Sequence, residues 1–230
     1  MIVGSIKEDI NLEKRISITP ETAKNIKNLG LEVYLEDGYA NHLGIKDKFY
    51  QEAGAKFYPS SSEVIENSDL LTRVNCPVDK EIKTLKNKSI LVGIFNPTKN
   101  EERLKQILKK DIKVFSLELL PRISRAQSMD VLSSQSNLAG YRAVIESIYE
   151  FEKAVPMMMT AAGTVPAAKV LVIGAGVAGL QAIATAKRLG AIVSATDVRE
   201  ASKEQVESLG GKFLTVEQKE NLETSGGYAK

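Results

Sequence analysis

Three glycines and one aspartate have the spacing of a site that holds a dinucleotide. Gly174, Gly176 and Gly179 follow one apolar run, and Asp197 ends the next. In such a turn the first glycine permits a tight bend, the second lets a pyrophosphate approach the backbone, and the third lets helix and strand pack closely. The helix that opens here would offer its N–H groups to the phosphates. The sequence therefore predicts a dinucleotide-binding strand–turn–helix.

The acid at the end of the second apolar run bears on which dinucleotide is bound. Asp197 would accept hydrogen bonds from the adenosine ribose, and its charge would repel a 2′-phosphate, which favours NAD over NADP. Arg199 follows closely, however, and an arginine at this place can accommodate a 2′-phosphate. A tight turn without any ligand is the plainer alternative for a glycine motif of this length.

The elements that would position this turn alternate along the chain. Short apolar strands are expected at residues 2–6, 33–35, 56–58, 69–74, 89–95 and 113–117, with helices at 20–29, 47–53, 79–85 and 100–109 between them. Thr19 would cap the first of these helices, with Pro20 at its first position. Alternation of this kind predicts parallel sheets covered by helices on both faces, and so an α/β protein.

A long helical pattern then joins two predicted domains. The first domain is expected at residues 1–129, a linking helix and a linker of small residues at 130–164, and a Rossmann-like domain at 165–230. The methionines at 157–159 could line a pliable surface, although packing at a domain seam is the plainer interpretation. Both domains are predicted to be Rossmann-like and doubly wound.

The second predicted domain has room for at most three strands, about half of a doubly wound sheet. The sequence therefore indicates a fragment, or one piece of a split subunit. A half-sheet should expose apolar surface, and should therefore associate with other protein or be unstable.

Composition excludes several classes of function. The net charge is +2 in 230 residues, with acids and bases interspersed, so nothing indicates a nucleic-acid partner. One histidine, His42, and one cysteine, Cys76, allow neither a histidine-based metal cluster nor an internal disulfide. The apolar stretch 170–186 is too short to cross a membrane and is interrupted by the glycine turn. We therefore expect no bound metal and no direct membrane insertion.

Segments outside the glycine turn resemble a known family more specifically than the turn does. They are LPRISRAQSMD at 120–130, NLAGYR at 137–142 and GGYAK at 226–230. With these, the whole chain resembles the NAD(H)-binding alpha subunit of proton-translocating NAD(P)⁺ transhydrogenase, which is related to alanine dehydrogenase. The resemblance implies hydride transfer from NADH to NADP⁺ held by a partner component, coupled to proton movement in a membrane component. It also implies a homodimer, located in the cytoplasm at the inner face of the inner membrane through partner subunits.

The resemblance also implies site residues. Arg122, Gln127 and Asp130 would act at the nicotinamide, Ser133 would join their network, and Gln127 would reach towards the second nucleotide. The wall of the nucleotide site would include Ile123, Ser124, Arg125, Val177, Val198 and Arg199, and Gly227 and Tyr228 would begin a mobile loop that closes over the nucleotide. Spacing alone leaves another interpretation open, in which Asp130 caps the long helix and Arg122 and Arg125 are solvated.

Two rival functions remain. Alanine dehydrogenase shares the opening pattern, including Arg15, but its substrate-binding lysine aligns with Asn75 and its acid–base histidine with Asn96. An asparagine neither carries charge nor exchanges a proton near neutral pH, which argues against amino-acid oxidation. The second rival is a truncated, non-catalytic nucleotide-binding or assembly fragment.

Overall fold

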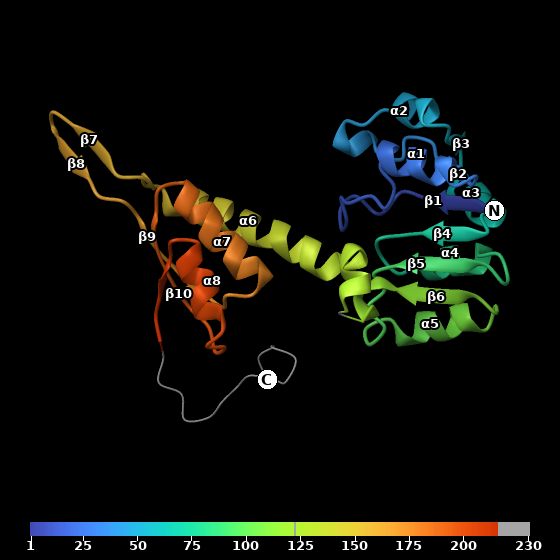
Figure 1. Ribbon diagram of the computed structural model, residues 1–230. Coiled ribbons are helices and arrows are strands. Elements are labelled where there is room, and N and C mark those ends of the chain that lie inside the picture. The colour runs from blue at the N-terminus through green and yellow to red at the C-terminus, as the bar shows by residue number, and fades with distance from the viewer. Residues whose placement is uncertain (122, 216–230) are drawn as a thin grey trace. The chain divides into compact units, whose positions relative to one another are not determined.

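The chain divides into two compact units, Met1–Asp130 and Val131–Lys230. The computed structural model describes residues 1–121 and 123–215 (Figure 1). The division falls beside the start of the long helix that the sequence predicted, and this helix belongs to the second unit.

The first unit is built on a six-stranded parallel sheet with the order β3-β2-β1-β4-β5-β6. Its strands are β1 (Ile2–Ser5), β2 (Glu32–Glu36), β3 (Lys56–Tyr58), β4 (Leu70–Thr72), β5 (Ile90–Gly93) and β6 (Lys113–Ser116). Its helices are α1 (Pro20–Asn28), α2 (Asp47–Glu52), α3 (Ser61–Asn67), α4 (Asp79–Thr84) and α5 (Glu101–Leu108), with 3-10 helices η1 (Asn41–Leu43), η2 (Leu117–Leu119) and η3 (Ser124–Met129). This is the strand order of a doubly wound α/β fold, which confirms the predicted class.

Two apolar clusters form the core of the first unit. Leu71 belongs to a cluster with residues of α3, α4 and α5, whereas its neighbour Leu70 packs against a cluster with residues of α1 and α2. Because successive residues of a strand point to opposite faces, the two clusters lie on opposite faces of the sheet. Helices therefore cover both faces, as the alternating pattern predicted.

The α1 start confirms the predicted cap: the Thr19 hydroxyl accepts a hydrogen bond from the Thr22 N–H, and Pro20 stands in the first turn. Helix α3 was not expected. Its N-terminus carries a recognisable signal, because the Ser60 hydroxyl accepts from the Glu63 N–H and donates to the Glu63 carboxylate.

The described portion of the second unit contains a three-stranded parallel sheet, ordered β11-β10-β9. Its elements are α6 (Val131–Phe151), β7 (Met158–Thr160), β8 (Gly163–Val165), β9 (Lys169–Ile173), α7 (Val177–Arg188), β10 (Ile192–Thr196), α8 (Ser202–Ser208) and β11 (Lys212–Phe213). This order matches one half of a doubly wound sheet, as predicted.

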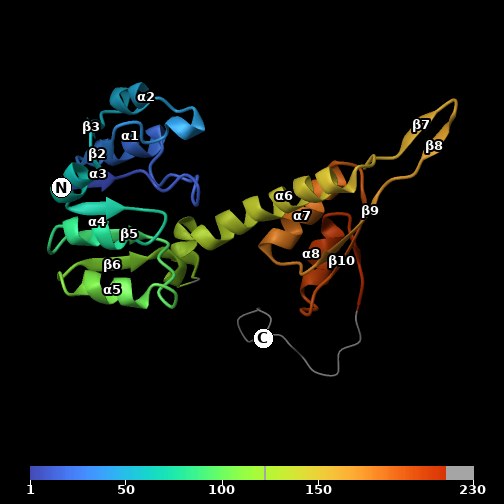
Figure 2. The same cartoon turned by 180° about the vertical axis from the view of Figure 1, so that it is seen from behind.

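Helices α6 and α7 lie side by side in both views (Figures 1 and 2). Gly140 of α6 is buried at their contact, where an added Cβ would lie 2.0 Å from the carbonyl oxygen of Ala178. The two backbones therefore approach more closely than any residue with a side chain would allow.

The predicted linker contains an unexpected antiparallel hairpin. Strands β7 and β8 pair from Met158 with Val165 to Thr160 with Gly163, and the hairpin extends away from the rest of the second unit (Figures 1 and 2). Met157 and Met159 are 60% and 75% exposed, so the methionine run is not buried packing within the described chain.

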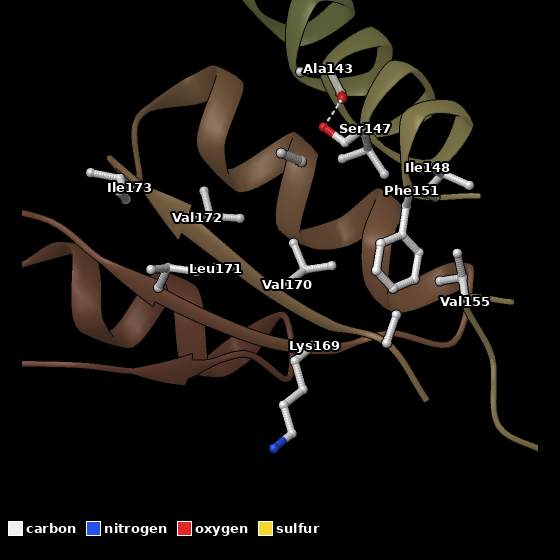
Figure 3. A pocket seen from close by; sticks show the side chains of 13 residues that line it. Ala143, Ser147, Ile148, Phe151, Val155, Lys169, Val170, Leu171, Val172 and Ile173 are labelled. Atoms are coloured by element: carbon white, nitrogen blue, oxygen red, sulfur yellow. Dashed lines mark hydrogen bonds between the residues drawn. The ribbon is translucent and has the colours of Figure 1, made fainter. Parts of the chain in front are cut away.

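Strand β9 is at the edge of its sheet and borders an apolar hollow. Figure 3 shows Phe151 of α6 and Val170 of β9 pointing into it. Leu171 and Ile173 on the same strand are 56% and 82% exposed. The second unit thus has the exposed apolar surface that a half-sheet predicts. Among the described helices, none is both long and apolar enough to span a membrane.

Candidate functional site

The predicted glycine turn connects β9 to α7. Gly174 has φ +94°, a left-handed conformation that residues with a side chain rarely adopt, and its N–H donates to the Thr196 carbonyl at 2.8 Å. That bond ties the turn to the end of β10, the strand that Asp197 follows. The first glycine therefore has the bending role that the sequence predicted.

The other two glycines differ in what surrounds them. An added Cβ at Gly179 would lie 1.8 Å from the Gly174 carbonyl oxygen, so only glycine lets the helix pack against the turn. At Gly176 the nearest atom to an added Cβ is Nη2 of Arg199, at 3.9 Å. The structure thus keeps space beside Gly176 that packing does not require.

The start of α7 can receive an anion in that space. Gly176 is its N-cap and provides no side-chain hydrogen bond. The N–H groups of a first helical turn lack partners within the helix, and the helix dipole is positive there. The turn therefore suits a phosphate for two reasons: there is open space beside Gly176, and the N–H groups at the start of α7 can donate hydrogen bonds to it.

Asp197 lies beside this turn, and its carboxylate is bound on both oxygens. Oδ2 accepts from the Ala175 N–H at 2.6 Å and from Nη2 of Arg199 at 3.1 Å. Oδ1 accepts from the backbone N–H of Arg199 at 2.8 Å and from its Nε at 3.0 Å. The predicted acid is thus held against the glycine turn and paired with the arginine that follows it.

The ionisation of Asp197 is set by opposing influences. Partial burial raises its pKa, but the hydrogen bonds from Arg199 and from the Ala175 N–H outweigh burial, so the pKa lies below its usual value. Its side chain is only 6% exposed and that of Arg199 is 19% exposed. Asp197 is therefore a carboxylate at neutral pH.

The structure brings together only some of the predicted residues. Gly174, Gly176, Gly179, Asp197 and Arg199 meet at the turn in the second unit. Val177 begins α7 and is 45% exposed, and Val198 is 37% exposed. Ser133 lies in the first turn of α6, which precedes the strands of this sheet in the sequence.

The remaining predicted residues belong to the first unit or are not described. Ser124, Arg125 and Gln127 lie in the 3-10 helix η3 with Ile123 just before it, and all four are exposed. Asp130 directly precedes α6, and its N–H donates to the Gln127 carbonyl at 3.2 Å. Arg122, Gly227 and Tyr228 lie outside the described residues.

The positions that align with the alanine dehydrogenase site have other partners here. The Glu13 carboxylate accepts the backbone N–H, Nε and Nη2 of Arg15 at 2.7–2.9 Å. The side-chain hydrogen bond from Arg15 is the main reason that the pKa of Glu13 lies below its usual value. The Asn96 N–H donates to Glu118 at 2.5 Å. Within the described residues, no group of three metal-ligating side chains occurs.

Sequence analysis missed a buried network of ion pairs that lies next to Asn75. Arg73, whose side chain is 5% exposed, donates to Glu8 at 2.9 and 3.1 Å and to Glu81 at 2.5 Å. Glu8 also accepts the N–H groups of Val74 and Asn75. The network fixes the backbone after β4, at the end of the strand where Asn75 stands.

Comparison with known proteins places both units in one family of domains. Residues 4–139 match the model for the alanine dehydrogenase/PNT N-terminal domain, and residues 143–226 match that for the C-terminal domain.

Individual relatives agree with this match. The chain is 51% identical over 225 residues to an NAD(P) transhydrogenase subunit alpha chain of Rhodospirillum rubrum, covering 95% of this chain and 59% of that protein. The crystal structure of transhydrogenase from Sinorhizobium meliloti is 50% identical, with a TM-score of 0.90 over 94% of this chain and 64% of that one. An alanine dehydrogenase of Staphylococcus epidermidis is 31% identical, over 94% of this chain and 58% of that protein.

Proposed function

The chain belongs to the alanine dehydrogenase/PNT family, and on that premise we propose that it is the NAD(H)-binding component of an NAD(P) transhydrogenase. The observation that carries the proposal is the turn at Gly176, where open space and helical N–H groups stand beside a charged Asp197. The chain spans 59% of the length of its Rhodospirillum rubrum relative, which is named as a transhydrogenase subunit.

In this proposal the coenzyme is NAD(H). Its pyrophosphate binds the first turn of α7 beside Gly176, and its adenosine ribose binds Asp197. The low pKa of Asp197 supports a preference for NAD over NADP, because a carboxylate repels a 2′-phosphate. Val177, Val198 and the backbone of residues 122–125 complete the wall of the site.

The reaction proposed is direct hydride transfer, in which NADH supplies the hydride to NADP⁺. The protein's role is to hold the ring in position, since orientation is most of what a protein contributes to such a step. Arg122 and Asp130 orient the nicotinamide carboxamide, which has a donor and an acceptor end, and Ser133 joins them. Gln127 reaches towards the second nucleotide, and Gly227 and Tyr228 begin the closing loop.

The partners proposed are an NADP(H)-binding component and a membrane-spanning component that moves protons. In this proposal the chain lies in the cytoplasm, peripheral to the inner face of the inner membrane through its partners. A homodimer belongs to the proposal, and the exposed methionines of the β7–β8 hairpin support an association of this kind.

Alanine oxidation is the less favoured enzyme activity, because asparagines stand at the lysine and histidine positions and Arg15 is paired with Glu13. A non-catalytic nucleotide-binding or assembly fragment is favoured by one observation, the apolar edge of β9. If the sequence beyond this chain completes the sheet, hydride transfer should require that sequence while nucleotide binding to the turn should not.

Calorimetric titration of NADH against Asp197→Asn tests the nucleotide site. The substitution should weaken binding by about 1–2 kcal/mol, as loss of charge-assisted hydrogen bonds does. Glu200→Gln removes the same charge from an exposed position three residues away and is the control. Unchanged NADH affinity in Asp197→Asn would show that the ribose binds elsewhere.

Mixing with the NADP(H)-binding component tests the reaction. Reduction of an NADP⁺ analogue by NADH should be observed when the chain carries the remaining sequence of its relatives, and the chain without that sequence is the comparison. Gln127→Asn should slow this transfer while leaving NADH affinity nearly unchanged. NAD⁺ reduction with L-alanine in place of transfer would establish the rival enzyme.

A further inference from the structure

The carboxylate that the proposed function assigns to the ribose already has a full set of donors. A carboxylate offers about four acceptor positions. At Asp197, two are used by the N–H groups of Ala175 and Arg199, and two by Nε and Nη2 of the Arg199 side chain. A ribose hydroxyl can therefore bind Asp197 only if one of these donors leaves.

The donor that can leave is the side chain. The two N–H groups belong to the turn and to the residue after Val198, so their positions are fixed by the backbone. The guanidinium is held by rotatable bonds and is 19% exposed. The two hydroxyls of the adenosine ribose match in number the two donors that the guanidinium contributes.

The guanidinium also stands beside the space expected for phosphate. Its Nη2 is 3.9 Å from the position of an added Cβ at Gly176, the N-cap of α7. A phosphate there would be the nearest new anion for a guanidinium released from Asp197, and the pairing of arginine with phosphate is strong and often bidentate.

We propose that Arg199 exchanges partners when the dinucleotide binds, passing from the Asp197 carboxylate to the pyrophosphate while the ribose hydroxyls take its place. The exchange rests on the proposed function. It makes Arg199 a positioning residue that closes the ribose site to ligands without a phosphate. Adenosine must displace the guanidinium without compensation, whereas ADP-ribose supplies the phosphates that receive it.

Calorimetric titration of the full 230-residue chain with adenosine and with ADP-ribose tests the exchange. Arg199→Met keeps the stem but removes the donors, so adenosine should bind at least about threefold more tightly and ADP-ribose at least about threefold more weakly. Arg199→Lys keeps the charge without the two-pronged contact, so adenosine should again gain affinity while ADP-ribose stays within about twofold of the unmodified chain.

Arg188→Met, in the last turn of α7, removes the same charge at the opposite end of that helix and should change neither affinity. Equal changes for both ligands in Arg199→Met, or weaker adenosine binding, would overturn the exchange and leave the proposed function standing. If the unmodified chain bound neither ADP-ribose nor NADH, the proposed function would be overturned, and the exchange with it.

Discussion

Replacing Gly176 with alanine should weaken coenzyme binding while changing stability little. Gly176 has φ −75° and ψ −168°, an extended conformation open to any residue. The nearest atom to the new methyl, Nη2 of Arg199 at 3.9 Å, is at ordinary contact distance. Alanine has less freedom than glycine in the unfolded chain, which favours folding by about 0.4–1 kcal/mol, but alanine is also the poorer N-cap residue by a similar amount. The free energy of unfolding of the second unit should therefore change by less than about 1 kcal/mol in Gly176→Ala.

The same methyl would occupy the space that a phosphate needs. It would move the phosphate away from the N–H groups at the start of α7, and a hydrogen bond to a charged group is worth about 1.5–3 kcal/mol. Loss of one such bond should weaken NADH binding by about ten- to hundredfold. Adenosine has no phosphate, so its affinity should stay the same.

Urea unfolding and calorimetric titration with NADH and adenosine measure these effects. Gly179→Ala is the contrasting variant, because its methyl would lie 1.8 Å from a backbone oxygen of Gly174. That variant should lose stability and both affinities together. NADH affinity that is unchanged in Gly176→Ala, or that falls equally with adenosine affinity, would refute a phosphate site at this turn.

Three further outcomes follow from contacts elsewhere. Gly140→Ala places a methyl 2.0 Å from the Ala178 carbonyl oxygen, so the amides of α6 and α7 should lose about 1–3 kcal/mol of hydrogen-exchange protection, with the amides of the first unit as internal reference. Arg73→Met leaves Glu8 buried without its partner and should lower the free energy of unfolding, measured in urea, by about 3–5 kcal/mol. Adding Glu8→Gln removes the buried charge and should recover some of this loss. If stability did not recover, the unpaired charge would not be the cause. The folded-state pKa of Asp197 lies below its unfolded value, so the stability it contributes is present at neutral pH and is lost as pH falls below about 4. The difference in unfolding free energy between Asp197→Asn and the unmodified chain should therefore be constant from about pH 8 to 5 and shrink below about pH 4; a difference that persisted at lower pH would place its origin elsewhere.

The strands and the glycine turn could be predicted because their signals are local. Each strand predicted in the first unit is present within two residues of its expected ends, since short apolar runs between turn residues leave few alternatives. Helix α3 could have been found from Ser60 and Glu63. The β7–β8 hairpin could not, because its exposed strands lack the alternation of a half-buried sheet and its small residues are typical of a linker.

The candidate site was predictable in its residue types and not in their contacts. The spacing of Gly174 to Asp197 is set by one helix and the strand that follows it, so it can be read along the chain. The pairing of Asp197 with Arg199 depends on side-chain torsions that no spacing reveals. The need for Gly140 comes from a second helix that approaches it from elsewhere in the chain.

The close approach at Gly140 has a mechanical consequence for the glycine turn between β9 and α7. Tightly packed interiors are barely compressible and transmit displacement from one element to the next. Because the α6 backbone packs directly against Ala178 in the first turn of α7, helix α6 cannot slide or tilt without displacing Ala178. Since Ala178 lies in the first turn of α7, directly after the glycine turn, a displacement of α6 at Gly140 would also displace that turn.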